Sequence, residues 1–472
     1  MPKTVNNDFF VERKGKVKHL STIYDFEIPD LKRVKKEKER FLGLDIESDV
    51  NTGEPMFMGF FDGNKYQKTD SNLFDTFSKV LQLKRTMFAW SRFDSQQIFR
   101  LFYDQEDSFI ENDMPVVERN GIKYRIEQEI GHNIKLSVQE KWMSHPKFVF
   151  IIDISPFFDT NLYETAKELG IEYSKISKDY HIIDWEKYFV DEQYKEGVIQ
   201  SNFNDARAAW KIADSIFEDF YKVFNFYPSN IFSAGSKAKA GILAHAINKL
   251  GIKDAEKEIK SIGILSKKDH ELFSDMISFS TSAYSGGLIG APRIGYTENG
   301  YYSDKKSAYG HEISKLKDIS DCKVVKGKGE PPKDADYVNI SGTVNVPRTV
   351  FIHPITIKSV IDNTSSVRPT GVFKAGYTGK EREYSKTLGI TFSNETWVAY
   401  YTKGKKSIVA DLATDLLVKK ENAKTENERR ASKDVINSLY GLLFEAIRKN
   451  GKQGLSAGIF FNPVHAAEIT AN

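Results

Sequence analysis

Apolar runs in the first half of the chain predict the strands of a buried sheet. The charged residues at 31–40 give way abruptly to the apolar run FLGLDIES at 41–48, as expected where a linker enters a buried strand. A second apolar run at 55–61 follows the turn-like sequence NTGE, and the two runs together predict a β-hairpin. Two more strand-like segments lie at 86–90 and 148–154.

A helical periodicity follows these strands. Between residues 204 and 224 the apolar positions recur every fourth residue, which predicts an amphipathic helix and places Asp205 at its start. Strands combined with helices predict an α/β fold for this half of the chain.

The second half of the chain shows two patterns. Residues 338–350 and 371–401 alternate apolar and polar positions between turn signals, which predicts an antiparallel sheet. Residues 410–443 have a helical periodicity that is interrupted by the polar sequence KKENAKTENERR. They therefore predict two antiparallel helices with a short connection.

Length and composition narrow the class of protein. A chain of 472 residues is too long for one core and predicts roughly two to four domains. The formal net charge of +3 does not by itself indicate a nucleic-acid partner. The single cysteine, Cys322, excludes an internal disulfide framework, which fits a reducing compartment and predicts the cytoplasm. No apolar run approaches the ~20 residues that cross a bilayer.

Four acidic residues of the first half form a candidate metal site. Asp45 and Glu47 are two residues apart on a predicted strand, so both side chains point to one face, where paired anions can hold a divalent ion. Asp94 follows another strand-like run, and Asp205 opens the predicted helix. Four acids at one point could bind two metal ions that act on a nucleic-acid strand. Two exposed acids on a strand edge are the alternative for Asp45 and Glu47.

Two strings in the second half carry candidate nucleotide-binding residues. In YSDKKSAY, Asp304 at a strand end would hold a metal ion while backbone N–H groups cradle a triphosphate. In KDVINSLYG, the residues Lys433, Asn437 and Tyr440 stand four and three positions apart and share one helix face. This face offers a cation for a triphosphate, and an amide and a phenol for a base pair. A surface turn and an ordinary amphipathic helix are the respective alternatives.

In this order and spacing, these strings resemble family B DNA polymerases. LDIES resembles the DxE segment of their 3′–5′ exonuclease domain, and YSDKKSAY resembles motif A. KDVINSLYG matches Kx3NSxYG of motif B at every defined position. YSGG resembles the YxGG turn, where the main chain approaches template phosphates. The compact spacing is similar to that of small phage and plasmid enzymes, many of which are protein-primed.

The resemblance implies a fold class and a domain order. The expected class is α/β and α+β multidomain, with an RNase H-like 3′–5′ exonuclease domain, a polymerase palm and helical fingers, the palm being incomplete. The expected domains are an N-terminal segment and linker, the exonuclease, the first part of the palm, the fingers and the start of the returning palm. They occupy residues 1–40, 41–224, 225–404, 405–446 and 447–472.

The resemblance also assigns roles to single residues. The expected catalytic and metal-binding acids of the exonuclease are Asp45, Glu47, Asp94 and Asp205. The expected catalytic and metal-binding acid of the polymerase is Asp304. The expected nucleotide-binding residues are Ser307, Tyr309, Lys433, Asn437 and Tyr440. The expected DNA-binding residues are Tyr284, Gly286 and Gly287.

Four positions depart from the family pattern. Trp90 replaces the usual Asn before the second Asp, and Ser201 replaces the usual Tyr before the last one. Because that Tyr helps orient the attacking water in the family, we predict weakened proofreading and faster degradation by Ser201→Tyr. The Tyr-x-x-x-Asp string at 180–184 is the alternative, which we disfavour because no periodic helix surrounds it. In motif A, Ala308 replaces Leu, and Gly310 replaces Pro and is expected to loosen the turn.

One motif of the family is not found. YxDTD usually follows motif B, and its first Asp shares both catalytic metals with motif A, but no such string follows Gly441. Residues 461–472 resemble the helix that precedes this motif, and we expect its apolar face to lack partner strands. The resemblance thus implies the N-terminal part of a split or truncated DNA polymerase for DNA replication. It would be active only with a second polypeptide that carries YxDTD and the thumb.

The resemblance implies further partners and cofactors. These are primer-template DNA, dNTPs, and either a terminal protein or an oligonucleotide as primer, with no membrane. Mg²⁺ is expected at two ions per active site, with Mn²⁺ as the alternative. The location would be the host cytoplasm if the chain is phage-encoded. The competing functions are a stand-alone 3′–5′ exonuclease and a non-catalytic primer-template binding subunit.

Overall fold

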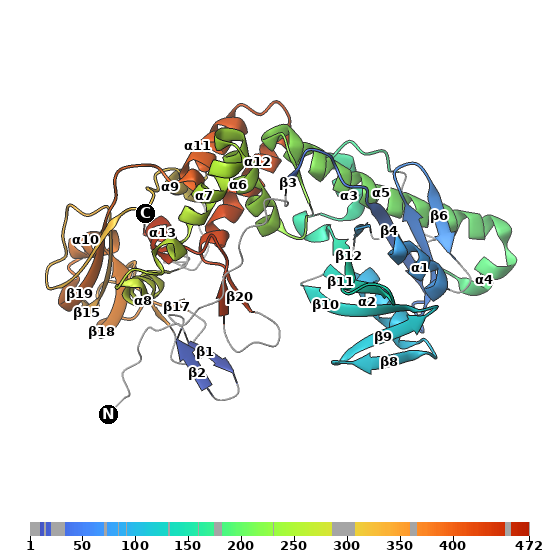
Figure 1. Cartoon of the computed structure of the whole chain (residues 1–472), viewed down its shortest axis with the longest axis horizontal. Helices are drawn as coiled ribbons and strands as arrows, with labels where there is room; N and C mark the ends of the chain where they lie inside the picture. The colour runs from blue at the N-terminus through green and yellow to red at the C-terminus, as the bar shows by residue number, and fades with distance from the viewer. Residues whose placement is uncertain are drawn as a thin grey trace, which may run out of the picture. The chain divides into compact units, whose positions relative to one another are not determined.

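The structure, a computed structural model, divides into two compact units (Figure 1). Unit 2 comprises residues 34–237, and unit 1 comprises residues 1–33 and 238–472. The structure describes residues 10–13, 16–19, 34–69, 73–83, 85–90, 92–130, 133–158, 160–173, 182–229, 231–285, 307–358, 366–448 and 455–471. The five expected domain ranges remain predictions, because this division separates only two bodies.

The described part of unit 2 is built on a nine-stranded sheet. Its central strands β4, β7 and β12 run parallel, and the outer strands pair antiparallel. Across the sheet the order is β6 (Tyr66–Thr69), β5 (Pro55–Phe61), β4 (Leu42–Ser48), β7 (Met87–Ala89), β12 (Lys147–Asp153), β11 (Asn133–Glu140), β10 (Ile122–Ile130), β9 (Met114–Arg119) and β8 (Ser108–Glu111). The predicted β4–β5 hairpin and the predicted strands β7 and β12 are confirmed.

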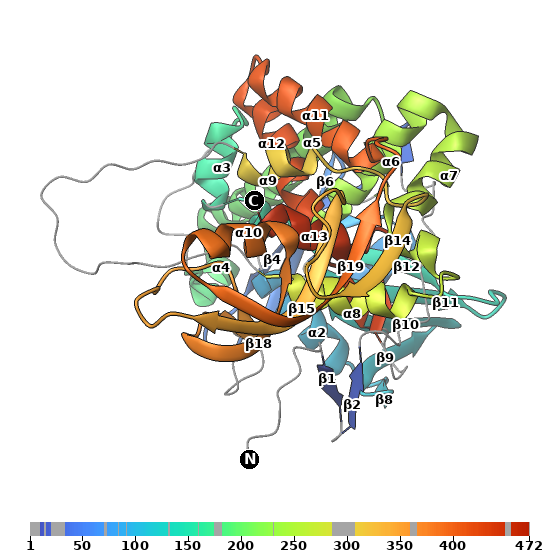
Figure 2. The same ribbon diagram turned by 90° about the vertical axis from the view of Figure 1, so that its left-hand side faces the viewer.

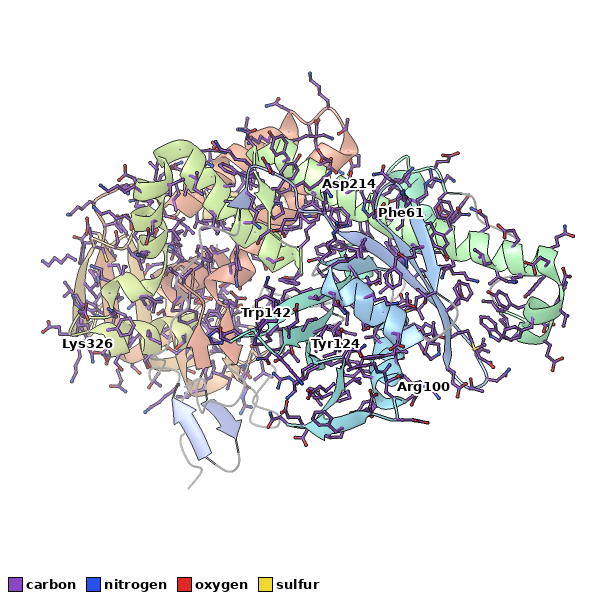
Figure 3. All side chains as sticks on the ribbon, turned by 45° about the vertical axis from the view of Figure 1, so that its right-hand side comes forward. Phe61, Arg100, Tyr124, Trp142, Asp214 and Lys326 are labelled. Atoms are coloured by element: carbon purple, nitrogen blue, oxygen red, sulfur yellow. The ribbon has the colours of Figure 1, made fainter. Side chains whose placement is uncertain are left out.

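Helices cover both faces of this sheet because its central strands are apolar on both sides. Helices α1 (Leu73–Gln82) and α2 (Arg92–Tyr103) pack on one face. Tyr124 of β10 lies in this core, where its hydroxyl accepts a hydrogen bond of 2.8 Å from Gln82 Nε2 (Figure 3). The long helix α5 (Glu192–Phe224) packs on the other face. Two short helices, α3 (Leu162–Glu168) and α4 (Trp185–Val190), precede it.

Two glycines allow α5 to approach the sheet closely. A Cβ built on Gly43 of β4 would lie 2.0 Å from the main-chain oxygen of Ala206, and one built on Gly59 of β5 would lie 1.8 Å from Asn202 Oδ1. No side chain fits at such distances, so glycine at both positions is a condition for this helix placement. Asp45, which pairs with Gly59 in the ladder, is thereby brought next to α5.

Unit 1 contains a four-stranded antiparallel sheet in its described part. Its order is β14 (Lys323–Lys328), β19 (Thr391–Tyr401), β15 (Tyr337–Val346) and β18 (Gly371–Thr378) (Figure 2). Helices α8 (Phe273–Ala283) and α13 (Pro463–Thr470) share a core with one face of this sheet. The predicted antiparallel sheet is confirmed, except that residues 379–387 form helix α10 (Gly379–Thr387) instead of strand.

The remaining helices of unit 1 include the predicted pair. Helices α11 (Ile408–Glu421) and α12 (Glu426–Leu443) are joined by residues 422–425 and pack against each other, which confirms two helices with a short connection. Both also contact the short helix α9 (Ala308–Ile313). Helix α6 (Ala234–Leu250) crosses the boundary between the units, and α7 (Ile252–Ile262) follows it.

Four isolated strand pairs lie outside the two larger sheets of the described residues. They are β1 (Phe10–Arg13) with β2 (Lys16–His19), β3 (Val34–Lys35) with β13 (Tyr227–Pro228), β16 (Ile357–Lys358) with β17 (Ser366–Val367), and β20 (Ala446–Arg448) with β21 (Leu455–Ala457). Among the described residues, no helix is both long and apolar enough to span a membrane.

Two expectations about helices are wrong. Asp205 does not start a helix, because α5 begins at Glu192, where the Asp191 carboxylate caps it by accepting hydrogen bonds from two main-chain N–H groups. The helix expected at 461–472 forms as α13, but its apolar face is not left without partners. Every residue from Pro463 to Ile469 is buried, and α13 packs against α8 and α12.

Candidate functional sites

The predicted acids of the first half meet between β4 and the helices of unit 2. Leu44 and Ile46 point into one core of the sheet, so the alternating residues Asp45 and Glu47 point to the other side, toward α5. Asp205 comes from the middle of α5, and Asp94 lies in the first turn of α2, directly after β7.

An amide lies at the centre of this cluster. Asn202 Nδ2 donates to Asp45 Oδ2 over 2.7 Å. The same nitrogen is 3.4 Å from Glu47 Oε1 and 3.3 Å from the main-chain oxygen of Asp45. Asn202 is fully buried, and its own Oδ1 accepts a hydrogen bond of 2.7 Å from the Tyr66 hydroxyl. The amide therefore links β4, β6 and α5 at the acids.

The other two acids have partners of their own. Asp94 is buried, and its Oδ1 accepts from the main-chain N–H of Ile46 over 3.3 Å, which ties α2 to β4. Asp205 Oδ1 accepts a hydrogen bond from the Tyr173 hydroxyl. Tyr173 follows α3, so a phenol reaches the last acid although position 201 carries serine.

Burial, together with crowding by neighbouring acids, favours the neutral forms of Asp45 and Glu47. Burial, followed by the neighbouring charges of Glu47 and Asp205, raises the pKa of Asp45 well above its usual range. Burial and the charge of Asp205 raise the pKa of Glu47 to about 7, although the hydrogen bonds of that carboxyl act in the opposite direction. Such shifts are frequent at functional sites, because like charges are held together there against their repulsion.

The acids have the right chemistry for a divalent ion but not yet the right arrangement. Carboxylate oxygens are the ligands that Mg²⁺ prefers. Among the described residues, however, no group of three or more His, Cys, Asp or Glu side chains is placed to hold a metal ion. Hydrogen bonds from Asn202, Tyr173 and the Ile46 main chain engage the carboxylates instead. The set of donors fits a metal ion, whereas the geometry of this arrangement does not.

Two of the positions that were compared with the family pattern have a packing or a capping role in the structure. Trp90 is half-buried in the core beneath α5, and its ring lies 5.8 Å from that of Phe158. Of the alternative pair at 180–184, residue 180 lies outside the described residues. Asp184 accepts a hydrogen bond of 3.0 Å from Lys187 N and caps α4, so its carboxylate has a structural use.

A row of aromatic rings brings the motifs of the second half together in unit 1. Tyr309 of α9 stacks on Tyr440 of α12 at 4.8 Å between ring centroids and 11° between planes. Tyr440 in turn lies 6.1 Å from Tyr284, and Tyr284 stacks on Phe444 at 3.7 Å. Three separate strings of the sequence therefore meet through their tyrosines.

The turn before α9 has an unusual backbone and a basic partner. Ser307 has φ 51° and ψ 41°, in the left-handed region that non-glycine residues rarely adopt, and its Oγ accepts from Lys420 Nζ of α11. From the sequence, Gly310 was expected to loosen the turn. This expectation is wrong, because Gly310 is buried inside α9. A Cβ there would lie 2.6 Å from Ile436 of α12, so glycine permits close packing of the two helices.

Two of the predicted nucleotide-binding residues of α12 face outward. Lys433 and Asn437 are exposed, whereas Tyr440 is half-buried in the aromatic row. Asp304, Gly286 and Gly287 lie outside the described residues.

Sequence reasoning did not identify three residues of the carboxylate cluster. Asn202 precedes Asp205 by three positions, so helical spacing alone would have placed both on one face of α5. Tyr66 and Tyr173 come from a strand and a loop without a spacing signal, and only the tertiary structure brings their hydroxyls to the site.

The comparison with solved structures gives matches, whereas those with protein families and with curated sequences do not. The chain matches no protein-family profile and no curated protein sequence. Among solved structures, it is similar to phi29 DNA polymerase, with TM-score 0.61 and 14% identity over 92% of this chain and 76% of that chain. The ternary complex of phi29 DNA polymerase with primer-template DNA and incoming nucleotide substrates gives a TM-score of 0.62. The identity is 14%, over 92% of this chain and 76% of that chain. The complex of phi29 DNA polymerase with single-stranded DNA gives a TM-score of 0.60 and 14% identity, over 92% of this chain and 75% of that chain. The chain therefore has the fold of phi29 DNA polymerase, which confirms at the level of the fold its resemblance to family B DNA polymerases.

Proposed function

We propose that the chain is a template-directed DNA polymerase of the family B type that acts in DNA replication. The observation that carries this proposal is the aromatic row of unit 1, in which tyrosines 284, 309 and 440 of three separate motifs lie together. A fold shared with a polymerase that binds primer-template DNA and incoming nucleotides supports the same conclusion.

In this proposal, α12 binds the incoming nucleotide. The exposed ammonium of Lys433 would pair with the triphosphate, and Asn437 and Tyr440 would lie along the base pair. Lys420, which holds Ser307 at the motif A turn, would add a second positive charge near the phosphates. Tyr309 would lie beneath the sugar and exclude a 2′-hydroxyl. Tyr284, with Gly286 and Gly287, would contact the template strand.

The reaction would be an in-line displacement at phosphorus. The primer 3′ oxygen loses its proton and forms a bond to the α-phosphate, while the bond to pyrophosphate breaks. Mg²⁺, with Mn²⁺ as the alternative, would neutralise phosphate charge when bound, and Asp304 is the proposed palm ligand. We propose that a carboxylate of a YxDTD motif, a string that is not found after Gly441 in this sequence, supplies the other palm ligand. The primer would be a terminal protein or an oligonucleotide.

Unit 2 is proposed as the 3′–5′ exonuclease. The meeting of Asp45, Glu47, Asp94 and Asp205 favours this assignment, because four carboxylates held together against their repulsion are typical of phosphodiester-cleaving sites. This observation also favours a second candidate function for the chain, a stand-alone exonuclease whose unit 1 grips DNA.

One assay separates these functions. The purified chain is incubated with a 5′-labelled primer-template, dNTPs and Mg²⁺, with and without a polypeptide that carries YxDTD. We expect primer shortening by the chain alone, and primer extension only after the second polypeptide is added. Shortening without extension under both conditions would instead support the stand-alone exonuclease.

Matched variants assign each activity to its unit. Asp45→Ala should abolish shortening and leave extension intact, whereas Lys433→Ala should reduce extension and leave shortening intact. Shortening that persists in Asp45→Ala would exclude the carboxylate cluster as the nuclease site. If neither activity occurs under any condition, the chain is a binding subunit and the polymerase proposal is wrong.

A further inference from the structure

Asn202 occupies the place among the acids that a cation would need. Its Nδ2 lies 2.7 Å from Asp45 Oδ2, 3.4 Å from Glu47 Oε1 and 3.3 Å from the main-chain oxygen of Asp45. Three oxygens around one point, two of them from carboxylates, are the surroundings of a hard divalent ion. Here they surround an uncharged amide nitrogen instead.

The orientation of this amide is fixed through its oxygen. The Tyr66 hydroxyl donates to Asn202 Oδ1 over 2.7 Å, so the amide oxygen already has a hydrogen-bond partner. Gly59 leaves the space for that oxygen, since a Cβ there would lie 1.8 Å from it. Asn202 is fully buried and has no room to swing into solvent. The nitrogen, rather than the oxygen, therefore faces Asp45 and Glu47.

A metal ion and this amide compete for the same oxygens. An ion bound to Asp45 Oδ2, Glu47 Oε1 and the Asp45 carbonyl would use the same oxygens that now lie within 2.7 to 3.4 Å of the Asn202 nitrogen. The lone pair that accepts the Asn202 hydrogen bond is also not available to the ion. This competition gives a physical reason why the described acids do not form a three-ligand metal group.

We propose that Asn202 lowers the affinity of unit 2 for divalent cations by holding Asp45 and Glu47 in a metal-free arrangement. The inference rests on the proposed exonuclease function and deepens it: Asn202 sets how readily that site takes up its cation. The opposite role, an amide that orients the carboxylates for the metal, predicts the opposite sign on mutation. The two roles are therefore separable by a binding measurement.

The experiment is a titration of the full-length chain with Mn²⁺, in which free Mn²⁺ is followed by electron paramagnetic resonance. The unit 2 site is the binding component that disappears in Asp45→Asn. We expect Asn202→Ala to bind Mn²⁺ at this site about tenfold more tightly than the wild type, a change of the size that ligand partners produce. Asn202→Asp should bind more tightly still, because it adds a carboxylate.

Two further variants guard against loss of folding as an explanation. Tyr66→Phe keeps the ring and removes the hydroxyl that fixes the amide, so it should also tighten Mn²⁺ binding. The matched control is Asn204→Ala, a buried amide on the same helix that accepts a hydrogen bond of 3.2 Å from Gln200, and it should leave the affinity unchanged. Structural damage weakens metal binding, so only competition accounts for a gain.

The outcomes separate this inference from the function on which it rests. Tighter binding in Asn202→Ala and Tyr66→Phe, but not in Asn204→Ala, supports it. Unchanged or weaker binding in Asn202→Ala, with a component that Asp45→Asn removes, overturns it and leaves the exonuclease proposal standing. If no variant shows a Mn²⁺-binding component that Asp45→Asn removes, both the inference about Asn202 and the exonuclease proposal are wrong.

Discussion

His465 is a fully buried histidine whose two ring nitrogens both have partners. Its Nδ1 lies 3.0 Å from Asn462 Nδ2, and its Nε2 lies 2.9 Å from the main-chain oxygen of Lys317. The Asn462 amide nitrogen can only donate, so Nδ1 of His465 accepts and carries no proton. The Lys317 carbonyl can only accept, so the imidazole ring is neutral with its proton on Nε2. Burial lowers the pKa of His465 to about 4.

We predict that this histidine makes unit 1 sensitive to acid. Its folded pKa of about 4 lies below the ordinary value of 6.5, so the unfolded chain binds the proton more tightly. The stabilisation is complete above pH 6.5 and is lost as the pH falls toward 4, by about 3 kcal/mol in total. The measurement is the unfolding free energy as a function of pH.

The control is His465→Gln, which can donate to the Lys317 carbonyl and accept from Asn462 without titrating. It should flatten the profile between pH 4 and 6.5. Burial raises the pKa of Glu381 to about 7, so this residue changes the unfolding free energy with the opposite sign in this pH range. Its effect cancels when the unfolding free energies of the two proteins are subtracted at each pH. Identical slopes for the two proteins would show that His465 does not titrate on unfolding.

Arg382 is a second buried residue with a large expected effect. Its guanidinium binds both carboxylate oxygens of Glu395, at 2.7 and 2.8 Å, and it also reaches Glu330 at 2.7 Å. Arg382 is 3% exposed and Glu395 is 7% exposed, so neither charge can be solvated if the other is removed.

We predict that Arg382→Met lowers the unfolding free energy of unit 1 by about 3–5 kcal/mol, because it leaves a buried carboxylate unpaired. Lys386 lies on the same helix as Arg382, pairs with the exposed Glu330 and Glu383, and is the matched control. Lys386→Ala should change stability by less than about 1 kcal/mol. Denaturant unfolding of both variants is the measurement, and equal effects would contradict this account.

At this scale the sequence predicted the charged residues better than their partners. Acid spacing on β4 identified Asp45 and Glu47, because alternation along a strand fixes the side of a side chain. Asn202 and Tyr173 were missed because their roles depend on which surfaces α5 and the loop after α3 face. A polar residue becomes a site residue only through such tertiary contacts.

At the scale of elements, the seating of α5 on β4 decides the geometry of the carboxylate cluster. Gly43 lies beneath the main chain of Ala206, and a Cβ there would approach its oxygen to 2.0 Å. Because Asn202 and Asp205 lie on the same helix, any displacement of α5 also separates them from Asp45.

We predict that Gly43→Ala destabilises unit 2 by about 1–3 kcal/mol, since the helix must move away to admit one methyl group. The measurement is the thermal unfolding of unit 2. Gly441→Ala is the matched control, because a Cβ on that glycine of α12 meets nothing within 4 Å. It should be neutral or stabilise unit 1 by up to about 1 kcal/mol, as expected for alanine in a helix. A stable Gly43→Ala variant would contradict the close approach.

Element boundaries were less predictable than element types. The apolar stripe after residue 204 was visible, but the true start of α5 at the Asp191 cap was missed, although the buried residues Tyr194 and Val198 continue the stripe toward it. Helix α10 was missed in a stretch that otherwise forms strands. Its capping box between Thr378 and Glu381, however, is a local signal that the sequence does carry.

At the scale of the whole molecule, the fold of a phage polymerase persists at 14% sequence identity. Core positions tolerate exchange among apolar residues of similar volume, so fold similarity outlasts sequence similarity. Short polar motifs are under a different constraint, because each side chain must meet a particular group. This is why KDVINSLYG and LDIES indicated the fold although no family profile matches the chain.

The most direct test of the account is whether a template selects the nucleotide that the chain binds. The affinity of the chain with Asp45→Ala is measured for a labelled primer-template with a 3′-dideoxy end, with each of the four dNTPs in turn. We predict that only the complementary dNTP tightens the complex, by about fivefold, and that Lys433→Ala removes this gain without changing binding of the DNA alone. The same affinity with all four nucleotides would contradict the central claim that unit 1 is the nucleotide-selecting part of a DNA polymerase.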